Sequence, residues 1–324
     1  MAREDESLAA IAARPQSRGL TEIWIVWALF GLATVAVFET YWRIPPEELW
    51  KVHNSGFVGG AGRALVFVGF SPALAAFAVL PFVADRLEDR RAHILAAVAF
   101  ALCATVGFVQ TPSHLDPKWS NIWPVVGVAL GILLTAWAAR HGRPEPVRTT
   151  RGGDVARIVL GVVTLLWATP YIAAELGFHL DGVPFFGWVF QTGKLAPEPG
   201  SGHLHATVHY GHHHGLDGLL LVATALLLSR LLGGIRRPPL RVLTGAVLAL
   251  MLVYGWTNMV NDLWIEQVVK RGWTSHEVPS ILTPAANWGW AAVLVGAFAV
   301  WRFWFRQPSR TTPAEASPAI SSSA

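Results

Sequence analysis

Residues 218–256 read GLLLVATALLLSRLLGGIRRPPLRVLTGAVLALMLVYGW, which is two apolar runs around a short loop with four arginines. Extended to 207–231 and 240–262, each run is long enough to cross a bilayer, which takes roughly 20 apolar residues. A basic loop between two such runs is typical of a transmembrane hairpin whose loop faces the cytoplasm. This stretch therefore predicts a membrane protein.

The composition of the whole chain supports the same fold class. Of its 324 residues, 53% are hydrophobic and only 14% are charged, whereas a soluble domain carries about 25% charged residues. The single cysteine, Cys103, excludes an intrachain disulfide, a Cys-ligated zinc site and a CxxCH haem attachment. The net charge of +4 comes from basic residues in loops beside apolar runs, so membrane topology explains it better than nucleic-acid binding.

Eight apolar runs along the chain are candidates for membrane-spanning helices. We therefore predict an all-α, polytopic membrane protein built as an eight-helix transmembrane bundle. The expected spans are 21–42, 58–84, 92–111, 122–140, 155–177, 207–231, 240–262 and 281–304. The expected domains are a cytoplasmic N-terminal segment (1–20), the transmembrane domain (21–305) and a disordered cytoplasmic tail (306–324).

The arginines and lysines predict the orientation of the bundle. Eighteen of them lie in one alternating set of connecting segments and six in the other, while Arg63 lies within a span. Because the more basic set faces the cytoplasm, both termini are expected to be cytoplasmic. Only His93 and His141 then fall on the cytoplasmic side, and the other ten histidines are extracytoplasmic.

Half of the histidines occur in one stretch, residues 201–218, with the sequence SGHLHATVHYGHHHGLDG. If residues from about 202 onward are helical, then His205, His209, His213 and Asp217 share one face, with His212 beside them. Histidines four apart on a helix can hold one metal ion between their imidazoles. A solvated His-rich tract with no defined site is the alternative reading.

The neighbouring spans end in polar residues on the same side. Glu175 and His179 are four apart at the end of the fifth span, as are Asp262 and Glu266 at the end of the seventh. Imidazole and carboxylate ligands suit zinc, copper or iron. The expected metal ligands are His205, His209, His212, His213, Asp217, His179, Glu175, Asp262 and Glu266.

A haem is the second cofactor that the histidine positions allow. His53, His114 and His276 stand just before the second, fourth and eighth spans, an arrangement similar in layout to the haem A synthases. That resemblance implies that these three histidines, together with one of His209, His212 or His213, bind the cofactor. The family's Glu-x-x-His-Arg motif is absent, since Asn54 and Ser55 follow His53, so the likeness is one of arrangement. Arg63 would hold a haem propionate or an anionic lipid, or would form a structural ion pair with Glu39.

Three functions remain open from the sequence. The first is a membrane oxidoreductase with a metal or haem at the extracytoplasmic ends of spans five to seven, acting on a lipid-soluble or extracytoplasmic substrate. The aromatic loop 178–202 would then act as a lid or as an interfacial anchor. The second is a divalent metal-ion carrier or binding protein, and the third is a non-catalytic partner subunit or pH sensor. The chain has no Walker motif and no dinucleotide fingerprint, so we expect neither a nucleotide nor a nucleic acid as partner.

Overall fold

The computed structural model describes residues 20–44, 53–109, 116–143, 153–191, 195–197, 204–206, 215–281 and 284–306. Within these ranges, seven helical segments are long and apolar enough to cross a membrane. They are Thr21–Arg43, Gly56–Arg86, Arg90–Val109, Trp119–His141, Asp154–Glu175, Pro238–Val269 and Trp288–Phe305.

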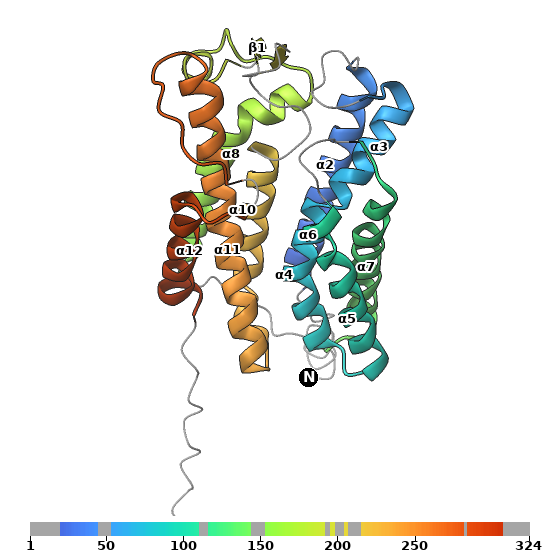
Figure 1. Ribbon diagram of the computed structural model, residues 1–324. Helices are drawn as coiled ribbons and strands as arrows, with labels where there is room; N and C mark the ends of the chain where they lie inside the picture. The colour runs from blue at the N-terminus through green and yellow to red at the C-terminus, as the bar shows by residue number, and fades with distance from the viewer. Residues whose placement is uncertain are drawn as a thin grey trace, which may run out of the picture.

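The N-terminal half of the chain forms one group of helices, on the right of Figure 1. Its elements are α2 (Thr21–Arg43), α3 (Gly56–Val68), α4 (Ser71–Arg86), α5 (Arg90–Ala104), α6 (Val106–Val109), the 3₁₀ turn η2 (Trp119–Asn121) and α7 (Ile122–His141). α2 packs along α3, and α5 packs along α7. α4 continues α3 after a turn, and Pro72 lies in the first turn of α4, where a missing N–H is tolerated.

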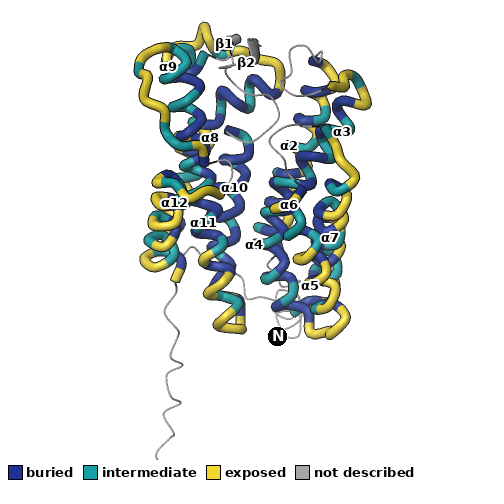
Figure 2. The backbone as a smooth tube through the Cα atoms, in the orientation of Figure 1, coloured by how far each residue is buried: buried dark blue, intermediate teal, exposed yellow. Residues whose placement is uncertain are grey.

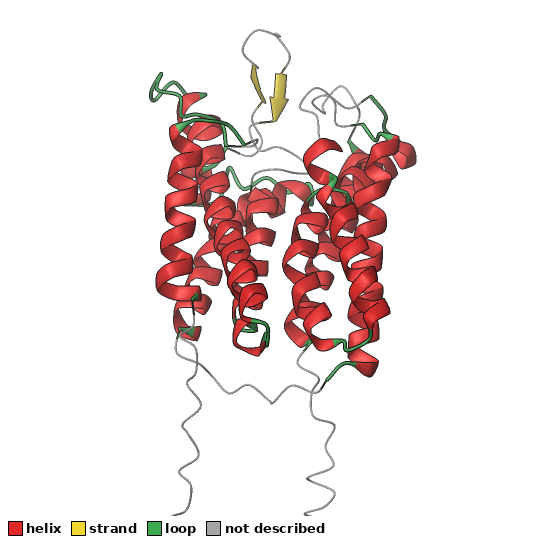
Figure 3. Ribbon diagram, turned by 60° about the horizontal axis from the view of Figure 1, so that its bottom comes forward, coloured by secondary structure: helices red, strands yellow, loops and turns green. Residues whose placement is uncertain are grey.

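The C-terminal half forms the second group. Its elements are α8 (Asp154–Glu175), α9 (Phe186–Val189), β1 (Leu195–Pro197), β2 (Leu204–Ala206), α10 (Gly215–Ser229), η3 (Leu232–Gly234), α11 (Pro238–Asp262), the π-helical η4 (Leu263–Val269), α12 (Trp288–Val300) and the π-helical η5 (Trp301–Phe305). α10 lies between α8 and α11, and α12 packs on the outer side of α11. The two short strands form an antiparallel hairpin beyond the helices (Figure 3).

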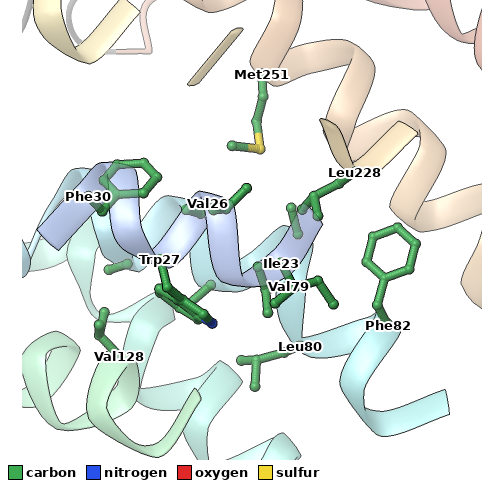
Figure 4. Packing of buried hydrophobic residues seen from close by; sticks show 14 of the residues in the cluster. Ile23, Val26, Trp27, Phe30, Val79, Leu80, Phe82, Val128, Leu228 and Met251 are labelled. Atoms are coloured by element: carbon green, nitrogen blue, oxygen red, sulfur yellow. The ribbon is translucent and has the colours of Figure 1, made fainter. Parts of the chain in front are cut away.

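The two halves meet where α2 and α4 face α10 and α11. Val26 of α2, Val79 of α4, Leu228 of α10 and Met251 of α11 are all buried in one apolar cluster there (Figure 4). Small residues let two of the helices approach closely, since a Cβ atom on Gly255 would lie 2.8 Å from the carbonyl oxygen of Gly218. Close packing through small residues is what holds helices together when lipid surrounds them.

The outward faces of the helices are apolar and exposed (Figure 2). On α8, for example, Ile158, Val162 and Leu166 are each more than half exposed. Contiguous exposed apolar side chains of this extent are unfavourable in water. Together with the length of the helices, they define an integral, multi-pass membrane protein whose outer surface contacts the lipid bilayer.

One end of the bundle, which we call the arginine end, is held together by ion pairs. Arg230, just after α10, contacts Glu22 of α2 at 3.0 Å and Asp154 of α8 at 3.2 Å. The carboxylate of Asp85 accepts a hydrogen bond from the backbone N–H of Arg236. These contacts join both halves of the bundle. The opposite end, where α2, α8 and α11 finish and α3 and α10 begin, we call the acidic end.

Seven of the eight expected spans correspond to the seven long helices. The sixth, expected over 207–231, corresponds to α10, whose 15 described residues are fewer than a membrane-crossing helix needs. Residues 207–214 lie outside the described residues. The count of eight spans and the orientation of the termini therefore remain predictions.

The prediction of a helix from about residue 202 is wrong. Residues 204–206 form strand β2, in which His205 is paired with Ala196. Pairing with β1 satisfies backbone groups that a helix rich in glycine would satisfy at a higher entropic cost. The i, i+4 spacing therefore does not put His205 on a helical face with Asp217, which lies in the first turn of α10.

Candidate functional site at the acidic end

Four carboxylates are buried at the acidic end. Glu175, Asp217, Asp262 and Glu266 are between 1% and 6% exposed, and they come from α8, α10, α11 and η4. Ionised groups are rarely this buried in a membrane-spanning region unless they have a function or a partner. All four were predicted as ligands, and the fold brings the helices that carry them together.

The C-terminus of α8 positions Glu175. The helix ends at Glu175, Gly177 adopts a positive φ of 82°, and the N–H of Phe178 donates to the carbonyl of Ala173. This is a Schellman cap, in which glycine avoids the strain of the left-handed conformation. The chain therefore turns away after Glu175, and His179 is exposed. The predicted pair of Glu175 with His179 on one helical face is wrong for this reason.

Glu175 instead lies toward α2 and α3. Its backbone carbonyl accepts a hydrogen bond from the hydroxyl of Thr40, and its carboxylate interacts electrostatically with Tyr41. The guanidinium of Arg63 lies 5.3 Å from the centre of the Tyr41 ring. Arg63 and Tyr41 are both almost fully buried. Residues from three helices in both halves of the chain thus form one polar cluster.

The predicted ion pair between Glu39 and Arg63 is wrong. Glu39 pairs with Arg43 at 2.9 Å, one turn further along α2, and both side chains are about half exposed. The fold turns Arg63 toward Tyr41 rather than toward Glu39. An arginine as buried as this one is stabilised by the face of the aromatic ring.

Asn258, Asp262 and Glu266 follow one another at intervals of four residues along α11 and η4, and all three are buried. The helix changes to π-helical geometry after Asp262. Single π-turns occur frequently at functional sites. Glu266 forms a 2.6 Å ion pair with Lys270, so part of its charge is already balanced.

α10 begins against this polar region. A Cβ atom on Gly215 would lie only 2.0 Å from the ring of Tyr171, so glycine is required for α10 and α8 to approach this closely. Tyr171 in turn interacts electrostatically with Asp262 and Glu266. Asp217, two residues into α10, interacts in the same way with Tyr254 of α11.

A tyrosine therefore accompanies each buried carboxylate. Tyr41 neighbours Glu175, Tyr171 neighbours Asp262 and Glu266, and Tyr254 neighbours Asp217. No sequence motif marks Tyr41 or Tyr171. Their scarcity is a signal, because the chain has only four tyrosines and the fourth is Tyr210, within the histidine stretch.

Three of the predicted histidines, His53, His179 and His276, lie at the surface, apart from the buried carboxylates. Nδ1 of His53 contacts the carboxylate of Asp116, and the His53 side chain is 67% exposed. His276 is exposed, and its backbone carbonyl accepts a hydrogen bond from the indole of Trp264. His114, His209, His212 and His213 lie outside the described residues, and only the backbone of His205 is described.

Within the described parts of the chain, no group of three His, Cys, Asp or Glu side chains converges as a metal site. The acids alone do not complete a coordination sphere there. Any centre built on them would need ligands from residues that lie outside these ranges.

The segment after α8 is fastened to the end of α11. Arg271 donates hydrogen bonds to the carbonyl oxygens of Trp188 at 2.7 Å and Val189 at 2.8 Å. The side-chain oxygen of Gln267 accepts a hydrogen bond from Arg271 and another from the backbone N–H of Gln191, both at 2.8 Å. Burial lowers the pKa of Arg271 and the charge of Asp181 opposes this shift. Two residues on η4 and just beyond it thus fix the position of the loop.

Between the acidic end and the arginine end, α8, α10 and α11 carry few polar groups. The hydroxyls of Thr164, Thr224 and Thr257 each donate to a carbonyl four residues earlier in their own helix. Such hydroxyls are satisfied locally. The polar residues of α8, α10 and α11 are thus concentrated at the two ends.

Comparison of the chain with protein-family models, with curated proteins and with solved structures finds no match. The class of the protein therefore follows from its own fold. It is an integral, multi-pass helical membrane protein. Its particular feature is a set of buried carboxylates at one end of the bundle.

Proposed function

We propose that this chain is an integral membrane metalloprotein with eight spans and cytoplasmic termini, whose acidic end faces away from the cytoplasm. Its centre would hold iron, copper or zinc, or a haem, at the ends of spans five to seven. The observation that supports this most is the burial of Glu175, Asp217 and Asp262, each at most 3% exposed, on three helices that pack together. The histidine stretch joins two of these helices in the sequence.

The buried carboxylates are suitable donors for a cation. Carboxylate oxygens bind divalent metal ions, and those of Asp217 and Asp262 are buried at this end of the bundle.

The histidines would supply the remaining ligands. His212, His213 and His214 directly precede Gly215, the first residue of α10 in contact with Tyr171. Neutral imidazole combined with carboxylate is a donor set for zinc, copper and iron. A carboxylate can also orient a ligating imidazole by accepting its second N–H.

A redox-active metal or haem in such a site supports an oxidoreductase, because it supplies electron or oxygen chemistry. The protein residues would bind and orient the substrate. In this proposal Tyr171, which lies beside Asp262 and Glu266, would exchange a proton with these acids.

The experiment is elemental analysis and an optical spectrum of the full chain in detergent. Stoichiometric metal is expected, and a Soret band would select haem. His209→Ala, His213→Ala and Asp262→Asn should each lose the metal while keeping the fold by circular dichroism. His179→Ala and Glu39→Gln are matched controls at exposed positions and should retain it. Equal metal content in all five variants, or no metal in the native chain, would refute the proposal.

The alternative function is a metal-ion carrier, and the hydrogen bonds of the threonines in the spans argue against it. A carrier should continue its polar path through the membrane, whereas Thr164, Thr224 and Thr257 bond to their own helices. We therefore expect no uptake of Zn²⁺ or Mn²⁺ into proteoliposomes above that of empty vesicles. A partner-subunit role without metal would leave the native chain metal-free in the same elemental analysis.

A further inference from the structure

The loop that follows α8 has two opposite faces. We call residues 178–191 the aromatic segment. Phe190 is 2% exposed and packs edge-on against Trp167, at 6.1 Å, and Tyr171, at 5.6 Å. Phe185 and Trp188 are 69% and 71% exposed. Among the described residues, one side of the segment packs within the protein and the other is exposed.

The backbone of the aromatic segment is held in an unusual conformation. Phe185 has a φ of 71°, and it is the one residue other than glycine with a positive φ among those that the structure describes. A bulky residue rarely adopts this conformation. Gly187 packs so closely on Asp181 that a Cβ atom would lie 1.9 Å from its carbonyl oxygen. Backbone strain of this kind persists where the surrounding contacts enforce it, often at functional sites.

Exposed aromatic residues also surround the rest of the acidic end. Trp42, Phe57, Trp119 and Trp273 are each more than half exposed. Tryptophan is enriched at the level where the hydrocarbon core meets the headgroups. The guanidinium of Arg271, which fastens the aromatic segment, lies 4.9 Å from the Trp273 ring centre. The segment therefore continues this aromatic belt, and it lies beside α8 at the end of the bundle (Figure 2).

We propose that the aromatic segment lies in the headgroup region of the bilayer, with Phe185 and Trp188 among the lipids, and that ligands of the buried carboxylates at the acidic end enter from the lipid past Phe190. This inference rests on the proposed function and adds its substrate class: an amphiphilic, lipid-soluble molecule. The occupant of the exposed aromatic face is the lipid leaflet at the acidic end.

A chain of neighbouring side chains links the exposed face of the segment to the carboxylates. Trp188 is exposed, Phe190 two residues later contacts Tyr171, and Tyr171 neighbours Asp262. Movement of Phe190 would connect the lipid-facing surface with the buried carboxylates at the acidic end. The hydrogen bonds of Arg271 to Trp188 and Val189 restrain that movement.

The first test measures membrane depth. The chain has one cysteine, buried Cys103, so Cys103→Ala gives a background in which Trp188→Cys or Phe185→Cys can carry an NBD fluorophore. Gly182→Cys is the matched control in the same segment, because a Cβ atom there meets nothing within 4 Å. In nanodiscs, labels at 185 and 188 should be quenched by doxyl-labelled lipids, and the label at 182 by aqueous iodide. Iodide quenching of all three, without lipid quenching at 188, would overturn the inference.

The second test measures the route. Phe190→Cys in the same background should react at least tenfold faster with a lipid-soluble pyrene maleimide than with a charged methanethiosulfonate, after correction for the reactivity of each reagent with the Trp188→Cys variant. The Arg271→Lys substitution, added to this variant, should accelerate labelling about tenfold. The lysine ammonium lacks the planar pair of N–H donors with which arginine binds both carbonyl oxygens. Faster reaction with the charged reagent would reject entry from lipid. If Phe190→Cys fails to fold, the effect of Arg271→Lys on the labelling of Trp188→Cys by the lipid-soluble reagent tests the route instead, and no acceleration would reject it.

The outcomes separate this inference from the proposed function. A metal-containing protein whose label at 188 stays in water keeps the metal centre and loses the lipid route. A metal-free protein whose label at 188 lies in lipid keeps the interfacial segment and loses the metal centre.

Discussion

Gly215, the first described residue of α10, faces the ring of Tyr171 on α8 so closely that a Cβ atom would lie 2.0 Å from it. Tyr171 is buried among Phe190 and Trp167 and has little room to move. The contact sets how near the start of α10 comes to the carboxylates of α11. A larger residue at position 215 should therefore affect both the stability of the protein and the position of α10 relative to these carboxylates.

Gly215→Ala tests this contact. Overpacking a rigid site of this kind destabilises by about 1–3 kcal/mol, so thermal unfolding in detergent should begin at a lower temperature. Gly31→Ala is the control, since its Cβ atom would meet nothing within 4 Å on the outer face of α2. If both variants unfold at the same temperature as the native chain, the result would contradict the close packing of Gly215 on Tyr171.

Arg230→Ala tests the arginine end. The change removes the ion pairs with Glu22 and Asp154, which join α2, α8 and α10. Hydrogen bonds to charged groups contribute about 1.5–3 kcal/mol when partly buried, and a similar loss of stability is expected. Denaturant unfolding measures it. Arg90→Ala, at an exposed position on α5, should lie within about 0.5 kcal/mol of the native chain.

Phe190→Ala compares the two faces of the aromatic segment. Truncating this buried ring should cost about 3–5 kcal/mol, because it leaves a cavity beside Trp167 and Tyr171. Phe185→Ala removes a ring that is 69% exposed and should change stability little. Equal effects in an unfolding titration would mean that the segment is not anchored through Phe190.

His53→Ala distinguishes the two cofactor arrangements. His53 is exposed and paired with Asp116, and an exposed pair of this kind contributes at most about 1 kcal/mol. A centre at the ends of α8, α10 and α11 predicts unchanged metal content in His53→Ala. Loss of haem from this variant would instead favour the arrangement that resembles the haem A synthases.

The sequence was most informative where the apolar pattern was long. Seven spans follow from length and composition. Most of their ends lie close to the expected positions, but the seventh continues to Val269 rather than 262 and the last begins at Trp288 rather than 281. The burial of Asp262 and Glu266 at the end of the seventh span was likewise within reach, because their four-residue spacing lies on an apolar helix.

The remaining features depend on contacts that no local pattern encodes. Gly177 caps α8 and separates Glu175 from His179, although their spacing alone predicts a shared face. His205 joins a strand because residues 195–197 are available to pair with it. Arg63 lies over the ring of Tyr41 rather than beside Glu39 because of the way α3 packs on α2.

The burial of Asp217 also places it within the transmembrane voltage. Gly218, the next residue, packs against Gly255 and Met259 of α11, short of the end of that helix at Asp262. A hydrocarbon core is about 30 Å thick, so a cation that reaches Asp217 from the acidic end would cross part of the transmembrane voltage. At about 2.3 kcal/mol per charge for a full 100 mV drop, occupancy near Asp217 would respond to the electrical state of the cell.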